Sequence, residues 1–337
     1  MLTKLRWLLF PISMVYGLMT VIRNFLFDLE IFKRKKFSVK LIGVGNLSMG
    51  GTGKSIVVDY LIKQLHKKEN IGVLSRGYKR ITKGYVLAKS NDNPQTIGDE
   101  PFQFHSKYSN ISVAISENRA NGISELEKSN LQTIILDDVF QHRWVKPNKL
   151  ILTTTFQRPY FKDYIFPVGN LREFAIGSNR ADIILVTKCP NQLTTETKKL
   201  FLKKIKPRLH QKIYFTKLSY PSKVYDHQKK TYPLETLKHQ KIKLITGIVD
   251  PNPLIEHLKS IELQIAPLPF PDHHHYTKSD FSQISLENES IVTTEKDFYK
   301  LIQVLNPNKV FYLPVRLEFF STKDASDFLN QLSIPND

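Results

Sequence analysis

The chain has 337 residues, which is enough for two domains, and 41% of its residues are hydrophobic, which is enough to fill their cores. Its one cysteine, Cys189, excludes a disulfide framework and cannot form a zinc site alone. The 49 Lys and Arg residues outnumber the 31 Asp and Glu residues, giving a net charge of +18. This charge favours an anionic partner, such as acidic lipid headgroups, a phosphorylated substrate or nucleic acid, although a soluble lysine-rich protein would have the same composition.

The first 36 residues differ from the rest of the chain. An uncharged, mostly apolar run lies between Arg6 and Arg23, and the basic cluster 33–36 follows it. The run is shorter than the roughly 20 apolar residues of a spanning helix, and Pro11 and Gly17 interrupt it. We expect residues 1–36 to form a membrane-associated helical segment on the bilayer surface. A secretory signal, and a helix packed on the protein's own core, are the alternatives.

A glycine-rich loop follows the first predicted strand, Leu41–Val44, and precedes a predicted helix that extends to Leu65. In this context the loop predicts a nucleoside-triphosphate site, because its backbone amides and the helix N-terminus attract phosphates. Lys54 would reach between two phosphates, and Ser55 would offer its hydroxyl to Mg²⁺. Ser48 occupies the position where the usual pattern has its first glycine. The predicted nucleotide-binding residues are Ser48, Met49, Gly50, Gly51, Thr52, Gly53, Lys54 and Ser55.

Two further strand ends carry candidate residues. The strand 71–74 runs into Arg76, which would lie near the phosphate crevice of an open sheet, although it could equally be a surface arginine. The strand 133–136 ends in Asp137 and Asp138, which is how a magnesium-holding carboxylate is delivered beside such a loop. The strand 181–187 precedes a lysine-rich helix between residues 191 and 208.

Residues 222–241 are polar and irregular, and we place a domain boundary there. The predicted domains are therefore residues 1–36, 37–225 and 226–337. The last of these continues the α/β rhythm, with strands at 242–246, 291–294 and 309–313 and helices at 252–260 and 297–305. The predicted fold class is α/β: a P-loop NTPase-like parallel sheet flanked by helices, an N-terminal membrane-associated helix and a smaller C-terminal α/β domain.

One short segment of this last domain is rich in histidine. Asp272 precedes His273, His274 and His275. Adjacent histidines seldom bind one metal ion, and an Asp–His pair can instead orient a ring nitrogen for proton transfer.

Together these motifs resemble the tetraacyldisaccharide 4'-kinases, which phosphorylate the disaccharide precursor of lipid A. The resemblance extends over nearly the whole chain, and the family itself tends to have Ser or Thr at the position of Ser48. The apolar amino terminus also resembles the family's membrane-associated leader. Three residues depart from the family pattern, namely Val139, Asn170 and Phe174, and they affect loop shape more than chemistry. The motifs that carry the resemblance are residues 45–55, 75–78, 98–101, 136–142, 171–173, 272–273 and 294–297.

The resemblance implies a kinase that transfers the γ-phosphate of ATP to the 4'-hydroxyl of tetraacyldisaccharide 1-phosphate, forming lipid IVA. It implies that Asp99 takes the hydroxyl proton with His273 as its partner. We expect Lys54 on the β- and γ-phosphates, and Mg²⁺ on Ser55, one or both of the paired aspartates, and Glu173. Arg76, Arg119 and Arg172 are weaker candidates for phosphate contacts.

The expected partners are ATP, Mg²⁺, the acylated disaccharide phosphate and the cytoplasmic face of a bacterial inner membrane, with no nucleic acid and no obligate protein partner. The alternative is a membrane-associated P-loop ATPase or GTPase without a sugar acceptor. A nucleic-acid-binding protein would use the positive charge, but the chain has no recognition motif for it.

Overall fold

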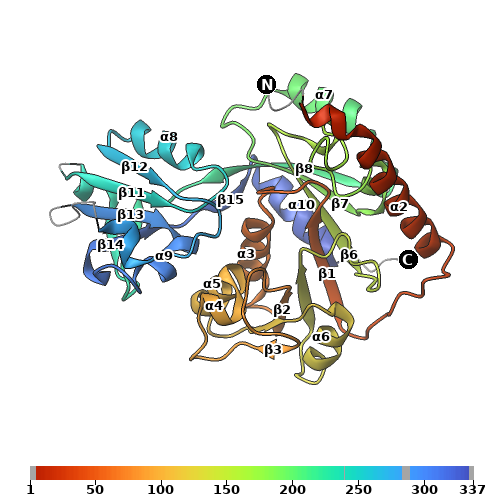
Figure 1. Ribbon diagram of the computed structural model, residues 1–337, viewed down its shortest axis with the longest axis horizontal. Coiled ribbons are helices and arrows are strands. Elements are labelled where there is room, and N and C mark those ends of the chain that lie inside the picture. The colour runs from red at the N-terminus through yellow and green to blue at the C-terminus, as the bar shows by residue number, and fades with distance from the viewer. Residues whose placement is uncertain (1–4, 239, 283–288, 334–337) are drawn as a thin grey trace.

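The computed structural model describes residues 5–238, 240–282 and 289–333, which fold around two β-sheets (Figure 1). The α-helices are α2 (Phe10–Asp28), α3 (Lys54–Leu65), α4 (Pro94–Ile97), α5 (Asp99–Lys107), α6 (Arg119–Leu126), α7 (Thr195–Ile205), α8 (Asn252–Ser260), α9 (Glu295–Leu301) and α10 (Thr322–Ser333).

The first sheet has the order β15-β8-β7-β6-β1-β5-β2-β4-β3. All neighbouring strands from β8 to β4 are parallel, and only the edge strands β3 and β15 pair antiparallel. Because β1 and β5 are parallel neighbours, the loop after β1 and the aspartates after β5 emerge at the same edge. The strands are β1 (Lys40–Asn46), β2 (Ile71–Ser75), β3 (Val86–Leu87), β4 (Ser112–Ile115), β5 (Thr133–Asp137), β6 (Lys149–Thr155), β7 (Ile183–Thr187), β8 (Lys212–Ser219) and β15 (Arg316–Phe319).

Both faces of this sheet are covered, which explains why its central strands are continuous apolar runs rather than alternating ones. On one face, residues of α3, α5 and α10 such as Leu61, Phe104 and Phe328 pack on the strands. On the other face, α6 and α7 contribute Ile123 and Phe201. The predicted α/β class, with a parallel sheet flanked by helices, is confirmed.

The second sheet has the order β10-β9-β14-β13-β11-β12 and is covered by α8 and α9. Its strands β14, β13, β11 and β12 are parallel, whereas β9 and β10 form an antiparallel edge. These strands are β9 (Lys223–Tyr225), β10 (Thr231–Pro233), β11 (Ile242–Thr246), β12 (Ile265–Pro269), β13 (Ser290–Thr294) and β14 (Val310–Leu313).

The chain crosses between the two sheets twice, next to the β8–β15 pair that Figure 1 labels. The sheet membership of the strands differs from the predicted ranges 37–225 and 226–337 at both ends. Strand β9 already belongs to the second sheet, and β15 with α10 returns to the first. The polar segment 222–241, predicted as a boundary, contains the edge strands β9 and β10. Local composition did not show the return, because β15 is short and half-exposed.

Helix α2 lies against the segment 163–174 with its small and polar side on the protein. Ser13 accepts from the Val168 amide at 3.0 Å and donates to the Ile165 carbonyl at 3.3 Å. A Cβ on Gly17 would lie 2.7 Å from the Phe174 ring, so the contact requires glycine. The outward side is apolar instead. Its exposed large apolar residues are Phe10, Ile12, Met14, Val15, Leu18, Met19, Val21, Ile22 and Phe25.

Candidate active site

The loop between β1 and α3 has the backbone geometry of a phosphate cradle. Gly50 and Gly53 adopt φ values of 101° and 84°, which favour glycine, and α3 starts directly after Gly53. The first-turn amides of α3 have no intrahelical acceptor and are therefore available to an anion. Two predicted members use their amides otherwise, because Met49 donates to the Asn170 carbonyl at 2.7 Å and Thr52 to the Gly50 carbonyl at 2.9 Å.

Residues that the sequence did not single out hold this loop in place. The Asn46 side chain donates to the Ser48 carbonyl at 2.7 Å and to the Thr52 hydroxyl at 2.9 Å. From β7, the Thr187 hydroxyl donates to the Thr52 carbonyl at 2.8 Å. The loop is thus anchored from two strands, which keeps its open amides in position.

Lys54 and Arg172 meet at one carboxylate. The Lys54 ammonium lies 3.4 Å from Asp138, and Arg172 donates to both oxygens of Asp138 at 3.1 and 3.2 Å. Burial raises the pKa of Asp138, but the charges of Lys54 and Arg172 outweigh it and hold the pKa below its ordinary value. Two cations beside one carboxylate leave a local excess of positive charge, which suits a polyphosphate.

Asp137, the last residue of β5, is buried behind Asp138. Its Oδ2 accepts from the Ser75 hydroxyl at 3.1 Å, whereas Oδ1 is buried with no hydrogen-bond partner in the described part of the chain. Burial and the neighbouring Asp138 charge raise the pKa of Asp137 to about 6, and Glu100 on α5 adds to this rise. A cation at this position would satisfy the orphaned oxygen and relieve the repulsion.

Arg119 does not present its guanidinium to the surface. The side chain is 2% exposed and donates to the backbone carbonyls of Ser116 and, at 3.0 Å, Asp137. Burial lowers the pKa of Arg119 to about 10, against the opposing pull of Asp137. Arg119 therefore supports the carboxyl end of β5 from inside the protein, and these contacts do not favour the predicted phosphate contact.

We therefore expect Arg119→Met to destabilise the fold. Leaving the carbonyls of Ser116 and Asp137 without a donor in a buried place should lower the free energy of unfolding by about 2–4 kcal/mol. Urea denaturation followed by circular dichroism measures the change. The exposed Arg208 provides the control, since Arg208→Met should stay within about 0.5 kcal/mol of the wild type. Equal urea midpoints for Arg119→Met and wild type would show that the buried guanidinium is dispensable.

The Glu173 carboxylate is 1% exposed and fully engaged by protein groups. Arg180 donates to both of its oxygens at 2.8 Å. Asn24 of α2 donates to Oε2 at 2.7 Å, and Gln141 donates to Oε1 at 3.2 Å. Glu173 therefore ties α2 to the loop after β5, and the predicted magnesium contact would require these bonds to rearrange.

Asp99 and His273, 174 positions apart, are in contact. Asp99 is the first residue of α5, and its Oδ2 lies 3.0 Å from Nδ1 of His273 and 3.0 Å from Nζ of Lys300 on α9. Burial raises the pKa of Asp99, but the hydrogen bonds and charges of His273 and Lys300 prevail and lower the pKa to about 2. The carboxylate is therefore ionised at neutral pH and able to accept a proton.

Arg76 lies in a basic cavity of about 370 Å³ that follows β2. The cavity is also lined by Lys79, Arg80 and Lys83, and its Tyr78 ring lies 5.2 Å from the His273 ring. The basic side chains of this cavity would suit an anionic group, and the phosphate contact of Arg76 stays a prediction.

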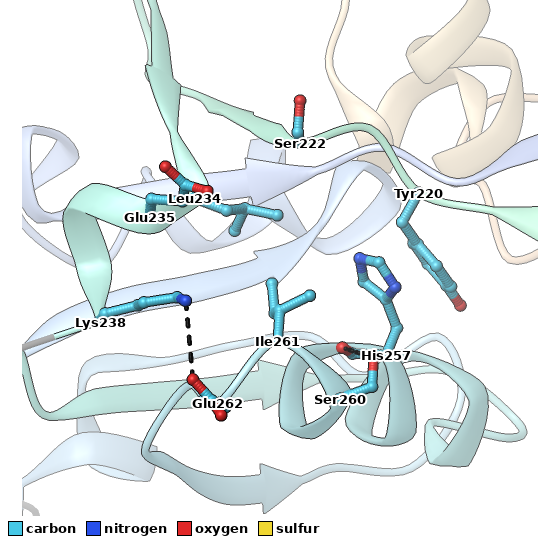
Figure 2. Close-up of a pocket in the computed structure, with 9 residues that line it drawn as sticks. All are labelled: Tyr220, Ser222, Leu234, Glu235, Lys238, His257, Ser260, Ile261 and Glu262. Carbon is cyan, nitrogen blue, oxygen red and sulfur yellow. Dashed lines mark hydrogen bonds and ion pairs between the residues drawn. The ribbon is translucent and has the colours of Figure 1, made fainter.

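A second cavity, of about 280 Å³, lies between α8 and the segment 220–238 and contains none of the predicted residues (Figure 2). His257 stacks on Tyr220 at its edge, and the Lys238–Glu262 pair at 3.7 Å closes another side. The predicted site residues instead follow strands of the first sheet or lie on the helices and loops next to them, apart from His273, which lies in the segment after β12.

Sequence reasoning gave no role to Lys296 and Lys300. The Lys296 ammonium lies 3.1 Å from Nε2 of His273 and 3.0 Å from Asp272. The motif 294–297 contains Lys296, and Lys300 follows four residues later on the same helix face. This spacing of four residues could have predicted that the two lysines point toward the same site.

Comparisons with known proteins agree with these observations. The profile of the family described as Tetraacyldisaccharide-1-P 4'-kinase matches residues 5–333. The chain is 42% identical over 327 residues to the tetraacyldisaccharide 4'-kinase of Flavobacterium johnsoniae, covering 96% of this chain and 95% of that one. It is 39% identical over 351 residues to the protein of the same name from Bacteroides thetaiotaomicron, covering 97% and 91%.

A solved structure agrees as well. The crystal structure of the "apo" form of LpxK from Aquifex aeolicus in complex with ATP superimposes with a TM-score of 0.78 at 29% identity, covering 97% of this chain and 99% of that one. With a family match from residue 5 to residue 333 and relatives of this similarity along almost their entire length, the chain belongs to the Tetraacyldisaccharide-1-P 4'-kinase family.

Proposed function

We propose that the protein is a kinase that transfers the γ-phosphate of ATP to the 4'-hydroxyl of tetraacyldisaccharide 1-phosphate, forming lipid IVA. The observation that carries this proposal is the meeting of two sets of groups. The loop with Lys54 and the paired aspartates follow β1 and β5 at one edge of the first sheet, and Asp99, which contacts His273, begins a helix that packs on the same sheet. The influence of Glu100 on the pKa of Asp137 supports the closeness of the two sets, since Glu100 is the neighbour of Asp99.

ATP is the phosphate donor, in line with the solved relative that holds ATP. The open amides at the start of α3 would bind the phosphate tail, with Lys54 between the β- and γ-phosphates. Lys54 now forms an ion pair with Asp138 at 3.4 Å, and it would have to break this pair to reach the phosphates. Arg172 remains on that carboxylate and keeps it ionised.

The residues present also fit Mg²⁺. Oδ1 of Asp137 is a buried acceptor oxygen without a hydrogen-bond partner in the described part of the chain. Asp138 lies 3.4 Å from Lys54, and Ser55 follows Lys54 in the first turn of α3, so both would be near a phosphate bound by Lys54. In the described residues no cluster of three or more His, Cys, Asp or Glu side chains is arranged to hold a metal. A magnesium ion bound through one or two carboxylates, phosphates and water does not need such a cluster. When bound, it would neutralise charge on the transferred phosphate.

Asp99 is the proposed proton acceptor. In the reaction the O4'–phosphorus bond forms, the bond between the γ-phosphorus and the bridging oxygen breaks, and ADP leaves with the electron pair. The hydroxyl proton passes to Asp99, whose low pKa keeps it available as a carboxylate. Arg76 and its basic cavity would hold a phosphate or another anionic part of the acceptor.

The cytoplasmic face of the inner membrane is the proposed location, and α2 the proposed anchor. The helical stretch Trp7–Asp28 is long and apolar enough to cross a membrane, and only 17% of its most apolar window is buried. Its docking along the segment 163–174 supports a helix that lies on the surface rather than one that leaves the protein. The apolar side would then enter one leaflet beside the acylated substrate.

We expect Val15→Asp with Leu18→Asp to abolish membrane binding without unfolding the protein. Both side chains are exposed, at 62% and 59%, so the change removes no internal contact. Sedimentation with anionic phospholipid vesicles should show bound protein reduced by about tenfold or more. Leu200→Asp is the control, because Leu200 is 61% exposed and belongs to α7 rather than to α2. Vesicle binding unaffected by the double change would rule out α2 as the anchor.

A direct test of the function is to incubate the purified protein with γ-labelled ATP and tetraacyldisaccharide 1-phosphate in detergent. The label should appear on the lipid, and release of inorganic phosphate without the lipid should be slow. Rapid release of phosphate in the absence of lipid, with no labelled lipid, would instead identify a nucleotide hydrolase.

A further inference from the structure

We infer that Lys300 is a positioning residue for phosphoryl transfer: together with His273 it occupies one oxygen of Asp99, Oδ2, and reserves the other, Oδ1, for the proton of the acceptor hydroxyl. This inference rests on the proposed role of Asp99 as the proton acceptor. It goes further by assigning the reacting oxygen and a function for the lysine of α9.

The two oxygens of Asp99 have different surroundings. Oδ2 lies 3.0 Å from His273 Nδ1 and 3.0 Å from Lys300 Nζ. In the described part of the chain no hydrogen bond reaches Oδ1. Two hydrogen bonds to one oxygen fix the orientation of the carboxylate. Its second oxygen keeps lone pairs that can accept a proton.

The hydrogen on His273 can be assigned from its other neighbour. Nε2 of His273 lies 3.1 Å from Nζ of Lys296, and an ammonium group can only donate. Nε2 must therefore accept, so the hydrogen of the neutral ring is on Nδ1 and is donated to Asp99. His273 donates its one ring hydrogen to Oδ2. The oxygen left to accept the proton of the substrate hydroxyl is therefore Oδ1.

Lys300 is built into the protein as a fixed cation. It is 3% exposed, and besides Asp99 it contacts the His274 carbonyl at 3.2 Å and Asp297 at 3.4 Å. Asp297 is itself held by the Gly247 amide at 2.8 Å. A buried lysine with all its directions occupied cannot move away from Asp99 without leaving a buried charge unpaired.

The contacts also cross from one sheet to the other. Asp99 begins α5, which packs on the first sheet, whereas Lys300 and His273 belong to the second sheet and its connections. The titratable groups that face Asp99 and its two partners from all sides are His273, Lys300, Lys296, Glu100, Asp272, Asp297, Tyr78 and Tyr276. Among these, Lys300 and Lys296 are the cations, and only Lys300 contacts Asp99 directly.

The test is the pH dependence of kcat for Lys300→Met, measured with both substrates saturating. Without this cation the burial of Asp99 should raise its pKa, so that the carboxylate protonates and kcat falls as the pH is lowered. We expect the acid limb of kcat to lie at higher pH than in the wild type, with kcat at pH 6 reduced by about tenfold or more relative to the wild type at the same pH. KM for ATP should stay within about twofold, because Lys300 is not part of the phosphate cradle.

Lys107→Met is the matched control. Lys107, the last residue of α5, is a half-buried lysine that pairs with Asp59 at 2.9 Å and with Glu295 of α9 at 3.0 Å, but it does not contact Asp99. A purely structural effect of losing such a lysine would lower the yield of folded enzyme and leave the pH profile unchanged. Should Lys300→Met fail to fold, Lys300→Gln keeps a donor without the charge, and its acid limb should shift in the same direction.

A double-mutant cycle with Asp99→Asn separates the possible failures. If Lys300 acts through Asp99, then Lys300→Met should cause no further loss of kcat in the Asp99→Asn background. Near-normal turnover of Asp99→Asn alone would overturn the proposed proton acceptor. An inactive Asp99→Asn combined with a wild-type pH profile for Lys300→Met, or for Lys300→Gln where the methionine variant does not fold, would overturn the role of Lys300 alone.

Discussion

Lys54→Met should lower kcat by about 10³-fold while leaving the protein folded. The ammonium is the one side-chain cation at the start of α3, and the proposed reaction needs it where negative charge moves from the γ-phosphate to ADP. Methionine has nearly the same length but no charge, so it removes the interaction without filling the cradle. The fold should persist, because Arg172 still neutralises Asp138 at 3.1 Å.

Initial rates with labelled ATP and the lipid acceptor measure this effect, and circular dichroism checks the fold. Lys63→Met is the matched control, since Lys63 is exposed in the last turn of the same helix, and its kcat should remain within about twofold. If Lys54→Met made lipid IVA at the wild-type rate, the loop after β1 would not be the nucleotide site.

Asp99→Asn should lower kcat by about 10²–10⁴-fold with little change in the KM for ATP. Asparagine has the shape of aspartate, but it cannot take a proton from the acceptor hydroxyl. The substitution also removes the negative charge between His273 and Lys300, which leaves the buried Lys300 with Asp297 as its remaining carboxylate partner. Some loss of stability is therefore expected in addition to the loss of turnover.

Rates should be compared at a temperature at which thermal denaturation shows both proteins fully folded. The neighbouring pair of Asp280 and His274, 3.2 Å apart, offers a matched control. Asp280→Asn breaks an equivalent contact that does not involve Asp99, and it should retain kcat within about threefold. Comparable losses in the two variants would indicate that the histidine segment matters only for local structure.

The strand, glycine-rich loop and helix of residues 40–65 could be predicted from the sequence because the pattern is local. A strand, three glycines, Lys54 and the following helix occupy one continuous stretch, and the structure has the expected strand, loop and helix there. Asp137 and Asp138 were likewise identifiable, since a polar pair at the end of an apolar strand is costly to bury. Parallel pairing of β1 with β5 then brings the two stretches to one edge.

Contacts between distant positions could not be predicted from the residues themselves. Only the resemblance linked Asp99 with His273, and nothing in the local pattern of Lys300 distinguished it from a surface lysine. For Arg119 and Glu173 the sequence suggested roles that their surroundings in the structure do not favour. Both carry charges of the right sign for phosphate and magnesium, but the structure buries them at 2% and 1% exposure and pairs them with protein groups. The burial of a side chain depends on the packing of several helices and strands, so it cannot be predicted from a single sequence motif.

The two passages of the chain between the sheets have a consequence for how this enzyme is assembled. Arg316 pairs directly with Ser219, so the stretch from residue 220 to residue 315 leaves and re-enters the first sheet at neighbouring points, in the manner of an inserted module. The module supplies His273 and Lys300, whereas the host supplies Lys54 and the aspartates after β5. Asp99 itself lies in the host, so the inserted module contributes the two groups that hold this carboxylate, and substitutions in the module can change the surroundings of Asp99 without changing the loop that carries Lys54.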